Sequence, residues 1–421
     1  MASESAVNFM KRDGSNILKR FLKLVLWIAG VILLIELVIY FLAPIYHFQE
    51  PEPFSGEMWY NPYQNLDTNH WRRANFHFHT RRWAGITAGK GTEEECYEQY
   101  KRLGYSVCAL SHYQHITEFQ KDSPYYIPVY EHGFGIRKKH QMLLGAKKVL
   151  WFDYSLVQNI NHKQHIINLL RPTSEIVTIA HPDWENGYSL EDMKYLSNYD
   201  LIEVLDNNWN SFQQWDAALS AGRPVYIEGD DDGHDIFDPY VVGRRCTFIN
   251  SPTVNRTDML ENLKSGNAFG ADIYMRENEP FDEKEIRSTM IPKVTEVNIQ
   301  HDTLWIKTDT TAMKFTFIGQ GGKARKVLYL TDAAWYKLQP EDTYIRTDIV
   351  FFSQYGHPGT IFYLNPVFRY NGDPPTNYLT AKINWERTWI FRVMMLGSLA
   401  VGLWLIIRYQ WRKKKFKQTD Q

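Results

Sequence analysis

Two long apolar runs near the ends of the chain confine any water-soluble folded part to the stretch between them. Leu24 to Leu42 is apolar except for Glu36 and follows several basic residues, and Trp389 to Ile407 precedes a basic tail. Each run is long enough to cross a bilayer as a helix, and the first lacks the features of a cleaved signal peptide. Because basic residues stay on the cytoplasmic side, the sequence predicts two transmembrane helices with both termini in the cytoplasm.

Between these runs the sequence pattern changes once. Up to about Phe269, short apolar stretches alternate with helical patterns, which is typical of a parallel sheet or barrel. Beyond it, short alternating stretches punctuated by Gly, Asn and Asp predict an antiparallel β-sandwich. The predicted divisions are a cytoplasmic N-terminus (1–23), a transmembrane anchor (24–46), a linker (47–70), an α/β barrel (71–270), a linker (271–290), a β-sandwich (291–372), a linker (373–388), a transmembrane helix (389–408) and a basic cytoplasmic tail (409–421).

Composition narrows the function classes. The chain has 421 residues, 44% of them hydrophobic, and a formal net charge of -1, so it can form packed cores and has no general attraction to nucleic acid. Cys96, Cys108 and Cys246 form no CxxC pair and allow at most one disulfide; three small buried side chains are the favoured interpretation. The sequence has no Gly-rich phosphate loop, which argues against a nucleotide-dependent kinase or ATPase.

Metal-ligand residue types follow or flank successive predicted strands. These residues are His77 and His79 in a His-x-His pair, Glu131, His140, His181, and Asp232 and His234 in an Asp-Gly-His triplet. Sites gather at the C-terminal ends of parallel strands, so these side chains are expected to converge. Imidazole and carboxylate together suit Zn, Mn or Fe, and water on such a metal is a nucleophile near neutral pH. The sequence therefore predicts a metal-dependent hydrolase.

Five motifs in this order resemble the PHP (polymerase and histidinol phosphatase) superfamily, over about Trp71 to Phe269. The motifs are His77-Phe78-His79-Thr80, Glu131 followed by His140, Ala180-His181-Pro182, Glu203 with Asn207, and Asp232-Gly233-His234 followed by Val242-Gly243. The domain order, with a β-rich tail, is similar to that of bacterial membrane-attached members. The resemblance implies a distorted (βα)7 barrel that holds two or three divalent metals and mostly hydrolyses phosphoesters.

The resemblance also implies a set of metal ligands. The first metal would be held by His77, His79, Glu131 and Asp232, and the second by Glu131, His140 and His181. Glu131 would bridge the two metals, because the two oxygens of a carboxylate can each face one cation. His234 matches a ligand of the family's third metal.

Catalytic and substrate-binding roles fall on five residues. Asp232 is expected to orient or deprotonate the attacking water, and His234 to protonate the leaving oxygen if it binds no third metal. Arg81, Arg82 and Arg245 lie next to motif residues in the sequence. They are candidate phosphate-binding groups because a guanidinium matches phosphate geometry.

Two positions depart from the family pattern, and both concern the third metal. Ala84 or its neighbours stand where the family has Asp or His, and Tyr113 stands where it has a ligand histidine. His112 or His115 could still reach a metal. The sequence therefore predicts a two-metal centre whose third position is weakened or absent.

Three functions remain open at this stage. The first is a membrane-anchored, outward-facing phosphoesterase, periplasmic if the source is bacterial, whose partners are the membrane and a phosphoester and not nucleic acid. The second is a metal-dependent carbamate or carboxylic ester hydrolase, since the same activated water attacks carbon. The third is a non-catalytic envelope binding or scaffolding protein. Substrate, metal identity and oligomeric state are left open by the sequence.

Overall fold

The computed structural model describes residues 2–85, 87, 89–207, 209–276, 279–378 and 381–419, with the backbone alone at 2–17 and 413–419. The chain forms two compact units. One unit runs from Phe48 to Lys382 and has a mixed α/β fold; the other combines the two ends, Met1–His47 and Ile383–Gln421. Short elements outside the main sheets are β1 (Tyr46–His47), β17 (Lys382–Ile383), η1 (Trp83–Gly85), η2 (Arg171–Thr173), η3 (Trp184–Asn186) and η4 (Gln320–Gly322).

The unit built from the chain ends contains two long helices, α1 (Ala2–Leu42) and α8 (Trp385–Thr419). Leu18–Leu42 and Trp385–Arg412 are long and apolar enough to cross a membrane, and the apolar window of each is 0% buried. The two helices are joined by a hydrogen bond near one end of each: Arg392 Nη2 donates to the carbonyl of Leu42 at 2.6 Å. By length and composition the two helices are therefore candidate membrane spans.

A five-stranded sheet forms one wall of the other unit, in the order β5-β6-β7-β8-β9. β5, β6 and β7 pair antiparallel, whereas β7, β8 and β9 pair parallel. All residues of these strands are buried, as expected for a sheet covered on both faces. The strands are β5 (Val129–His132), β6 (Gln141–Leu144), β7 (Ile176–Ile179), β8 (Leu201–Leu205) and β9 (Tyr226–Gly229), and the helices after β6, β7 and β8 are α3 (Ile160–Leu170), α4 (Leu190–Tyr195) and α5 (Phe212–Ser220).

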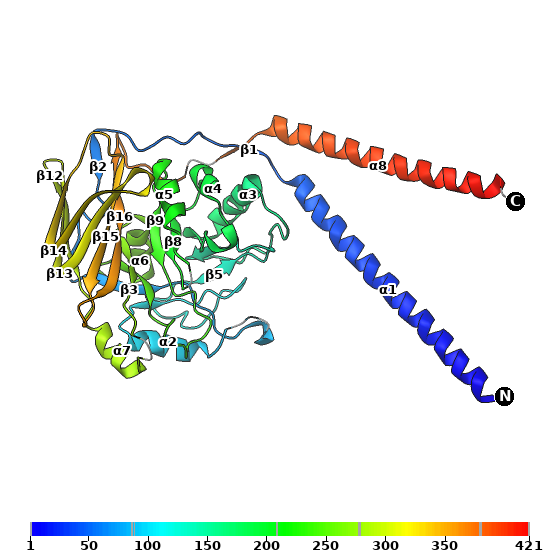
Figure 1. The fold of residues 1–421 in the computed structure, drawn as a ribbon, viewed down its shortest axis with the longest axis horizontal. Coiled ribbons are helices and arrows are strands. Elements are labelled where there is room, and N and C mark those ends of the chain that lie inside the picture. The colour runs from blue at the N-terminus through cyan, green and yellow to red at the C-terminus, as the bar shows by residue number, and fades with distance from the viewer. Residues whose placement is uncertain are drawn as a thin grey trace. The chain divides into compact units, whose positions relative to one another are not determined.

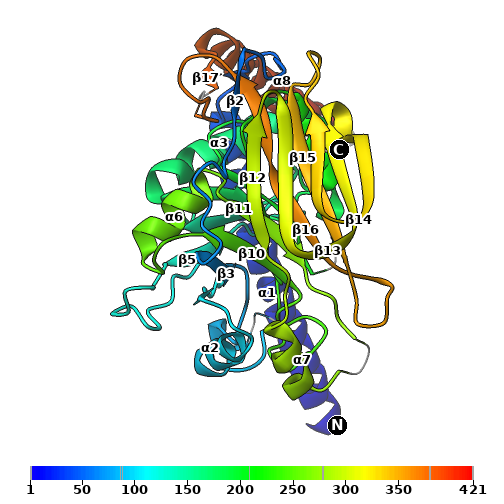
Figure 2. The same cartoon turned by 90° about the vertical axis from the view of Figure 1, so that its left-hand side faces the viewer.

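A ten-stranded sheet forms the second wall, in the order β12-β13-β15-β16-β11-β10-β3-β4, with β14 on β13 and β2 on β16 (Figures 1 and 2). β3 pairs with β4 in parallel and with β10 antiparallel. The strands are β2 (Met58–Tyr60), β3 (Trp71–Asn75), β4 (Val107–Cys108), β10 (Arg245–Asn250), β11 (Ala268–Asp272), β12 (Val294–Gln300), β13 (Thr303–Gly319), β14 (Lys323–Lys337), β15 (Tyr344–Phe352) and β16 (Pro358–Tyr370).

The strands predicted as a separate sandwich therefore continue a sheet that begins in the predicted barrel region. β11 pairs with β16, with Phe269 opposite Leu364. One hydrophobic core runs through both regions and includes Phe78, Tyr100 and Phe315. The strands of the predicted barrel region in this sheet and the β-rich tail thus share backbone hydrogen bonds and apolar packing.

Three helices complete the fold: α2 (Glu93–Arg102), α6 (Arg256–Lys264) and α7 (Phe281–Ser288). Thr92, with Glu95 three residues later, predicts a capping box in the sequence, and the structure confirms it: the Thr92 side chain accepts from Glu95 N and the Glu95 carboxylate accepts from Thr92 N. α7 lies where a linker was predicted (271–290), and its acidic first turn suits a helix N-terminus. Arg102 of α2 pairs with Asp282 and Glu285 of α7.

The sequence pattern of His162, Lys163 and His165 favours a solvated helix face, and this prediction is wrong for α3. His162 and Lys163 are both buried. The His162 ring packs on Tyr154, with centroids 4.4 Å apart, and Lys163 Nζ donates to Asp192 Oδ2 at 2.6 Å. A carboxylate on the neighbouring helix α4 lets the lysine be buried with its charge paired.

We expect the buried ion pair between α5 and β15 to hold the two regions together. Asp216 accepts from Arg346 Nε and Nη2, each at 2.8 Å. Asp216→Asn should lower the free energy of unfolding by about 2 kcal/mol, because Arg346 loses one of its two carboxylate partners and keeps only Asp348, which lies 2.7 Å from Nη1. Glu296→Gln is the matched control, since Glu296 pairs with Lys307 at the surface, and it should change the value by less than about 0.5 kcal/mol. Denaturant unfolding of the full-length chain in detergent measures both, and equal effects would contradict the expectation.

Candidate metal centre

The ends of the two sheets meet at the predicted site. Two isolated parallel bridges join them: Phe78 pairs with Gly233 beyond β3 and β9, and Tyr113 pairs with Glu131 beyond β4 and in β5. His79 N donates to the carbonyl of Gly233 at 2.8 Å. A Cβ on Gly233 would lie 2.0 Å from the Phe78 ring, so glycine permits this approach. The residues after β3, β7 and β9 are thereby brought to one place.

The His-x-His pair faces two carboxylates. His77 Nε2 lies 3.1 Å from Asp232 Oδ1 and 3.4 Å from Glu131 Oε2. His79 Nε2 lies 3.1 Å from Glu131 Oε2 and 3.4 Å from Asp232 Oδ1. All four side chains are buried. The first predicted ligand set is therefore assembled around one point.

The second predicted ligand set meets the other oxygen of Glu131. His140 Nδ1 contacts Glu131 Oε1, and His181 Nε2 lies 3.4 Å from the same oxygen. Both histidines are buried. Three groups of side chains could each hold a metal ion, with one ligand atom from each residue lying within 4.8 Å of the others: His77, His79 and Asp232; His77, Glu131 and His181; His181, Asp206 and Asp232.

The facing atoms fit a cation better than they fit one another. Among the described residues, His77 Nε2, His79 Nε2, Glu131 Oε2 and Asp232 Oδ1 are buried and form no hydrogen bond despite their close approach. Leaving such atoms unpartnered in the interior costs free energy. Divalent cations between the imidazole and carboxylate groups would satisfy these atoms, so the donor set suits Zn, Mn or Fe.

The electrostatics of the protein without cations reflect the crowding of these groups. Burial alone would lower the pKa of His77, but Asp232, Glu203 and Glu131 raise it well above its usual value. Burial would raise the pKa of Glu131, but His140 and His77 hold it well below its usual value. Burial would lower the pKa of His181. The hydrogen bond with Glu131 and the charges of Glu203 and Asp232 outweigh this effect and raise the pKa to about 9. A cation must displace these protons from the ring nitrogens before it binds.

Glu203 orients two of the histidines. Its Oε1 accepts from His77 Nδ1 at 2.8 Å, and its Oε2 accepts from His181 N at 2.9 Å. With the proton of His77 on Nδ1, Nε2 is left to face the centre, as is usual for metal-ligating histidines. Burial raises the pKa of the neighbouring Glu228 to about 8, so that carboxyl is held neutral below this pH.

Two of the predicted ligands sit on strained backbone. His181 has φ 27° and Asp232 has φ 39°, both in the left-handed region that residues other than glycine rarely adopt. His181 N is fixed by Glu203, and Asp232 precedes the glycine that packs on Phe78. Such strain persists only where the surroundings enforce it, and it clusters at functional sites.

The third predicted position is poorly equipped. His234 stacks on His79 with centroids 4.6 Å apart, and its Nε2 lies 3.6 Å from Asp232 Oδ1. Tyr113 also stacks on His79, at 4.5 Å, and His112 Nε2 lies 3.2 Å from Glu93 Oε1, turned to α2. None of the three ligand groups found in the described part of the chain includes His234, His112 or His115. His140 is also outside these groups, but unlike the other three it contacts Glu131 Oε1 directly.

The three candidate phosphate-binding arginines differ in their surroundings. Arg81 is exposed. Arg82 is paired with Glu93. Arg245 is buried, donates to Asn210 Oδ1 at 2.9 Å and lies 3.3 Å from Asp272 Oδ2. Partners from the protein thus already contact two of the three guanidinium groups.

Sequence reasoning missed two residues of the centre. Asp206 belongs to one ligand group, and Glu203, although part of a quoted motif, was given no role at the site. Asp206 directly follows β8, so the strand-end rule that identified His181 and Asp232 could have identified it.

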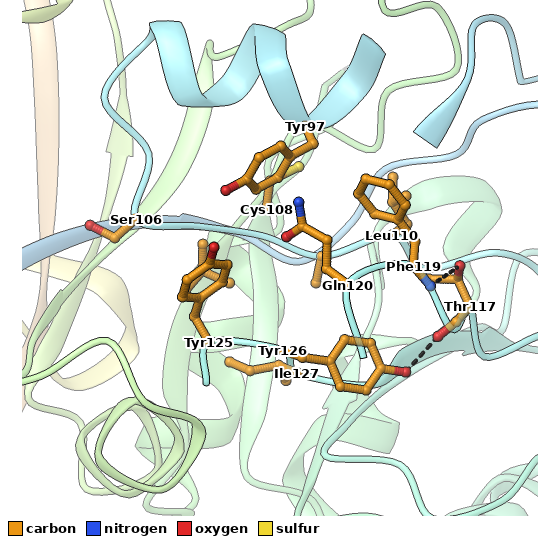
Figure 3. A pocket seen from close by; sticks show the side chains of 12 residues that line it. Tyr97, Ser106, Cys108, Leu110, Thr117, Phe119, Gln120, Tyr125, Tyr126 and Ile127 are labelled. Carbon is orange, nitrogen blue, oxygen red and sulfur yellow. Dashed lines mark hydrogen bonds between the residues drawn. The ribbon is translucent and has the colours of Figure 1, made fainter. Parts of the chain in front are cut away.

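A separate small pocket lies between α2, β4 and the following loop, where Tyr97, Cys108, Phe119 and Tyr126 line it (Figure 3). Cys108 Sγ lies 4.0 Å from Cys96 Sγ, and all three cysteines are free thiols. Cys96 and Cys246 are buried, as predicted for small packing side chains, and Cys108 is half-buried. This pocket contains none of the predicted site residues.

Comparisons with known proteins add a single distant likeness. No protein-family model matches the chain, and a search of curated proteins gave no significant match. One similar solved structure is described as a two-domain protein containing a predicted PHP-like metal-dependent phosphoesterase from Bacteroides vulgatus ATCC 8482. It is 11% identical, the likeness covers 80% of this chain and 97% of that chain, and the TM-score is 0.35. A likeness at this level assigns no function.

We expect metal affinity to rise with pH up to about 9, the pKa of His181 in the cation-free protein. Below this pH the imidazole holds a proton that a cation must displace, so Mn²⁺ affinity should fall about tenfold for each pH unit per displaced proton. Competition titrations of the chelator-treated full-length chain between pH 7 and 9 measure the slope. His165→Gln, outside the centre, should keep that slope, and His181→Gln should make it shallower. A slope of zero in the unaltered chain would contradict the expectation.

Proposed function

We propose that this chain is a metal-dependent phosphoesterase of PHP type with a dinuclear centre. The observation that carries the proposal is the set of three overlapping ligand groups, all buried and all formed by residues at or beside strand ends. The first cation is assigned to His77, His79, Glu131 and Asp232, and the second to Glu131, His140 and His181. The third position is proposed to be weak or absent, which agrees with the surroundings of Tyr113 and His112.

A distorted seven-stranded barrel is part of this proposal, covering 71–270, with 291–372 as the β-rich part. Support comes from strand pairing: β3 pairs with β4, and β5 to β9 follow in order. The bridges Tyr113–Glu131 and Phe78–Gly233 link β4 to β5 and β9 to β3. Together these pairings run through seven strands and return to the first, as in a closed barrel whose site lies at the strand ends.

The residues of the chain have separate tasks. A pair of divalent cations, when bound, would make a water acidic enough to lose a proton near neutral pH and would neutralise charge on the phosphate. Asp232 would orient the attacking water and accept its proton. His234, whose side chain is 32% exposed, lies 3.6 Å from Asp232 Oδ1. Burial lowers its pKa to about 4, so it is neutral near pH 7 and would protonate the leaving oxygen only after taking up that proton from Asp232. Arg81, exposed beside the His-x-His strand, is the best placed of the three arginines to meet a phosphate from solvent.

The two apolar helices are proposed to anchor the chain in a membrane with both termini in the cytoplasm and residues 48–382 on the outer side. The support is the length and apolar character of Leu18–Leu42 and Trp385–Arg412, together with basic residues outside both. The hydrogen bond from Arg392 to Leu42 ties the outer ends of the two helices, as expected if both enter the outer part on the same side of the membrane.

Two alternative functions are distinguished from this proposal by the experiments below. A carbamate or carboxylic ester hydrolase would use the same centre. A binding or scaffolding role would use surfaces such as the exposed Tyr329 and Trp335 of β14, whereas Tyr336 is buried and Trp305 is half-buried.

We expect the full-length chain with Mn²⁺ or Zn²⁺ to hydrolyse p-nitrophenyl phosphate or bis-p-nitrophenyl phosphate faster than p-nitrophenyl acetate. His77→Ala should lower kcat/KM at least about a thousandfold, because the cations that activate water and neutralise charge lose a ligand. His301→Ala, in the β12–β13 turn, is the matched control and should keep the activity. Faster turnover of the acetate would favour the carbonyl hydrolase, and no turnover with any metal would remove both catalytic functions.

We expect both ends of the chain to lie in the cytoplasm, because basic residues flank both apolar helices. A reporter that is active only in the cytoplasm should therefore be active at either terminus, and a reporter that is active only outside should be inactive there. The measurement is a pair of reporters, one active only in the cytoplasm and one active only outside it, fused in turn to each terminus. A fusion at Asn371, between β16 and α8, is the control and should report the outer side. Termini on opposite sides would refute the two-span arrangement.

A further inference from the structure

Asp206 is a buried carboxylate at the centre to which the resemblance gives no role. It follows β8, which lies between β7 and β9 in the sheet, so it sits between the strand ends that carry His181 and Asp232. The residue is 1% exposed. One of its oxygens, a ring nitrogen of His181 and an oxygen of Asp232 all lie within 4.8 Å of one another.

This group overlaps the other two. His77, His181 and Asp232 each belong to two of the three groups, so the groups occupy one continuous volume. A cation between His181 and Asp206 would therefore neighbour the cation held by His77 and His79. Asp232 belongs to the groups of both, and its two oxygens allow it to face two cations.

The atoms of this group are placed to hold a ligand. Asp232 Oδ1 is buried and has no hydrogen-bond partner among the described residues. His181 Nε2, the ring nitrogen that faces the second position, lies 3.4 Å from Glu131 Oε1. Asp232 and His181 are 6% and 0% exposed. A cation at this point would satisfy atoms whose burial is otherwise unfavourable.

We propose that Asp206 is a ligand of the second divalent cation and shares it with His181 and Asp232. The inference rests on the dinuclear centre of the proposed function and extends its ligand set. A further carboxylate makes the pair of sites more anionic and harder, which shifts the relative affinity of the second site toward harder cations such as Mn²⁺. The chain thus lacks an imidazole at Tyr113 and has a carboxylate at Asp206, which concentrates its ligands on two cations.

The test measures metal binding and not turnover. The full-length chain in detergent is stripped with a chelator and titrated with Mn²⁺, with free Mn²⁺ followed by its electron paramagnetic resonance signal. The unaltered chain should bind two equivalents. Asp206→Asn should weaken one equivalent at least tenfold and leave the other, whereas the matched control Glu191→Gln, an exposed acid on α4 paired with Lys194, should bind as the unaltered chain does.

A double-mutant comparison identifies the cation. If Asp206 and His181 hold the same cation, adding Asp206→Asn to His181→Ala should weaken binding less than it does alone. If the two substitutions weaken Mn²⁺ binding by amounts that simply add, the two residues hold different cations and the inference is overturned. So would an Asp206→Asn chain that binds both equivalents normally, even if its pH–rate profile changed, because Asp206 would then act only as a proton acceptor.

A second variant gives a direct signature if Asp206→Asn fails to fold. Asp206→Cys titrated with Cd²⁺ should show a thiolate-to-metal absorption band above that of the unaltered chain, whose three thiols set the baseline. No added band would overturn the inference. If Asp206→Asn loses one Mn²⁺ but the unaltered chain hydrolyses no phosphoester, Asp206 keeps its role as a ligand and the proposed function is rejected. If the unaltered chain binds no Mn²⁺, both are rejected.

Discussion

One buried carboxylate, that of Glu131, holds the centre together. Its two oxygens approach the rings of His77, His79, His140 and His181 from three separate parts of the chain. A fully buried carboxylate has a large desolvation cost, which only opposite charge or a cation can offset. The surrounding strands are therefore constrained to keep these rings in place, and the strained backbone at His181 is consistent with that constraint.

Much of this arrangement could be predicted from the sequence because strand ends have a simple geometry. The runs at Leu201–Leu205 and Met142–Leu144 coincide with β8 and most of β6, and the residues after the parallel strands meet as expected. Short continuous apolar runs identify such strands because burial on both faces demands apolar residues along the whole strand.

The parts that could not be predicted depend on distant pairing. β10 and β11 lack a distinctive pattern, and their place in the large sheet is set by β3 and β16, which are remote in sequence. The burial of His162 depends on its contact with Tyr154, and that of Lys163 on Asp192 in another helix. The role of Asp206 depends on its neighbours β7 and β9, which a linear reading does not place side by side. Local patterns determine elements, and tertiary contacts decide which surfaces those elements bury.

The pairing of β11 with β16 has a consequence for how this molecule is made. β16 ends at Tyr370 in a chain of 421 residues, yet it completes the sheet that carries β3 and the His-x-His pair. During synthesis, the earlier strands must wait with an unpaired hydrogen-bonding edge at β11 until nearly the whole polypeptide has emerged. A gene truncated shortly after Asp272 would yield a product with that edge of β11 permanently open, prone to join with other copies of itself.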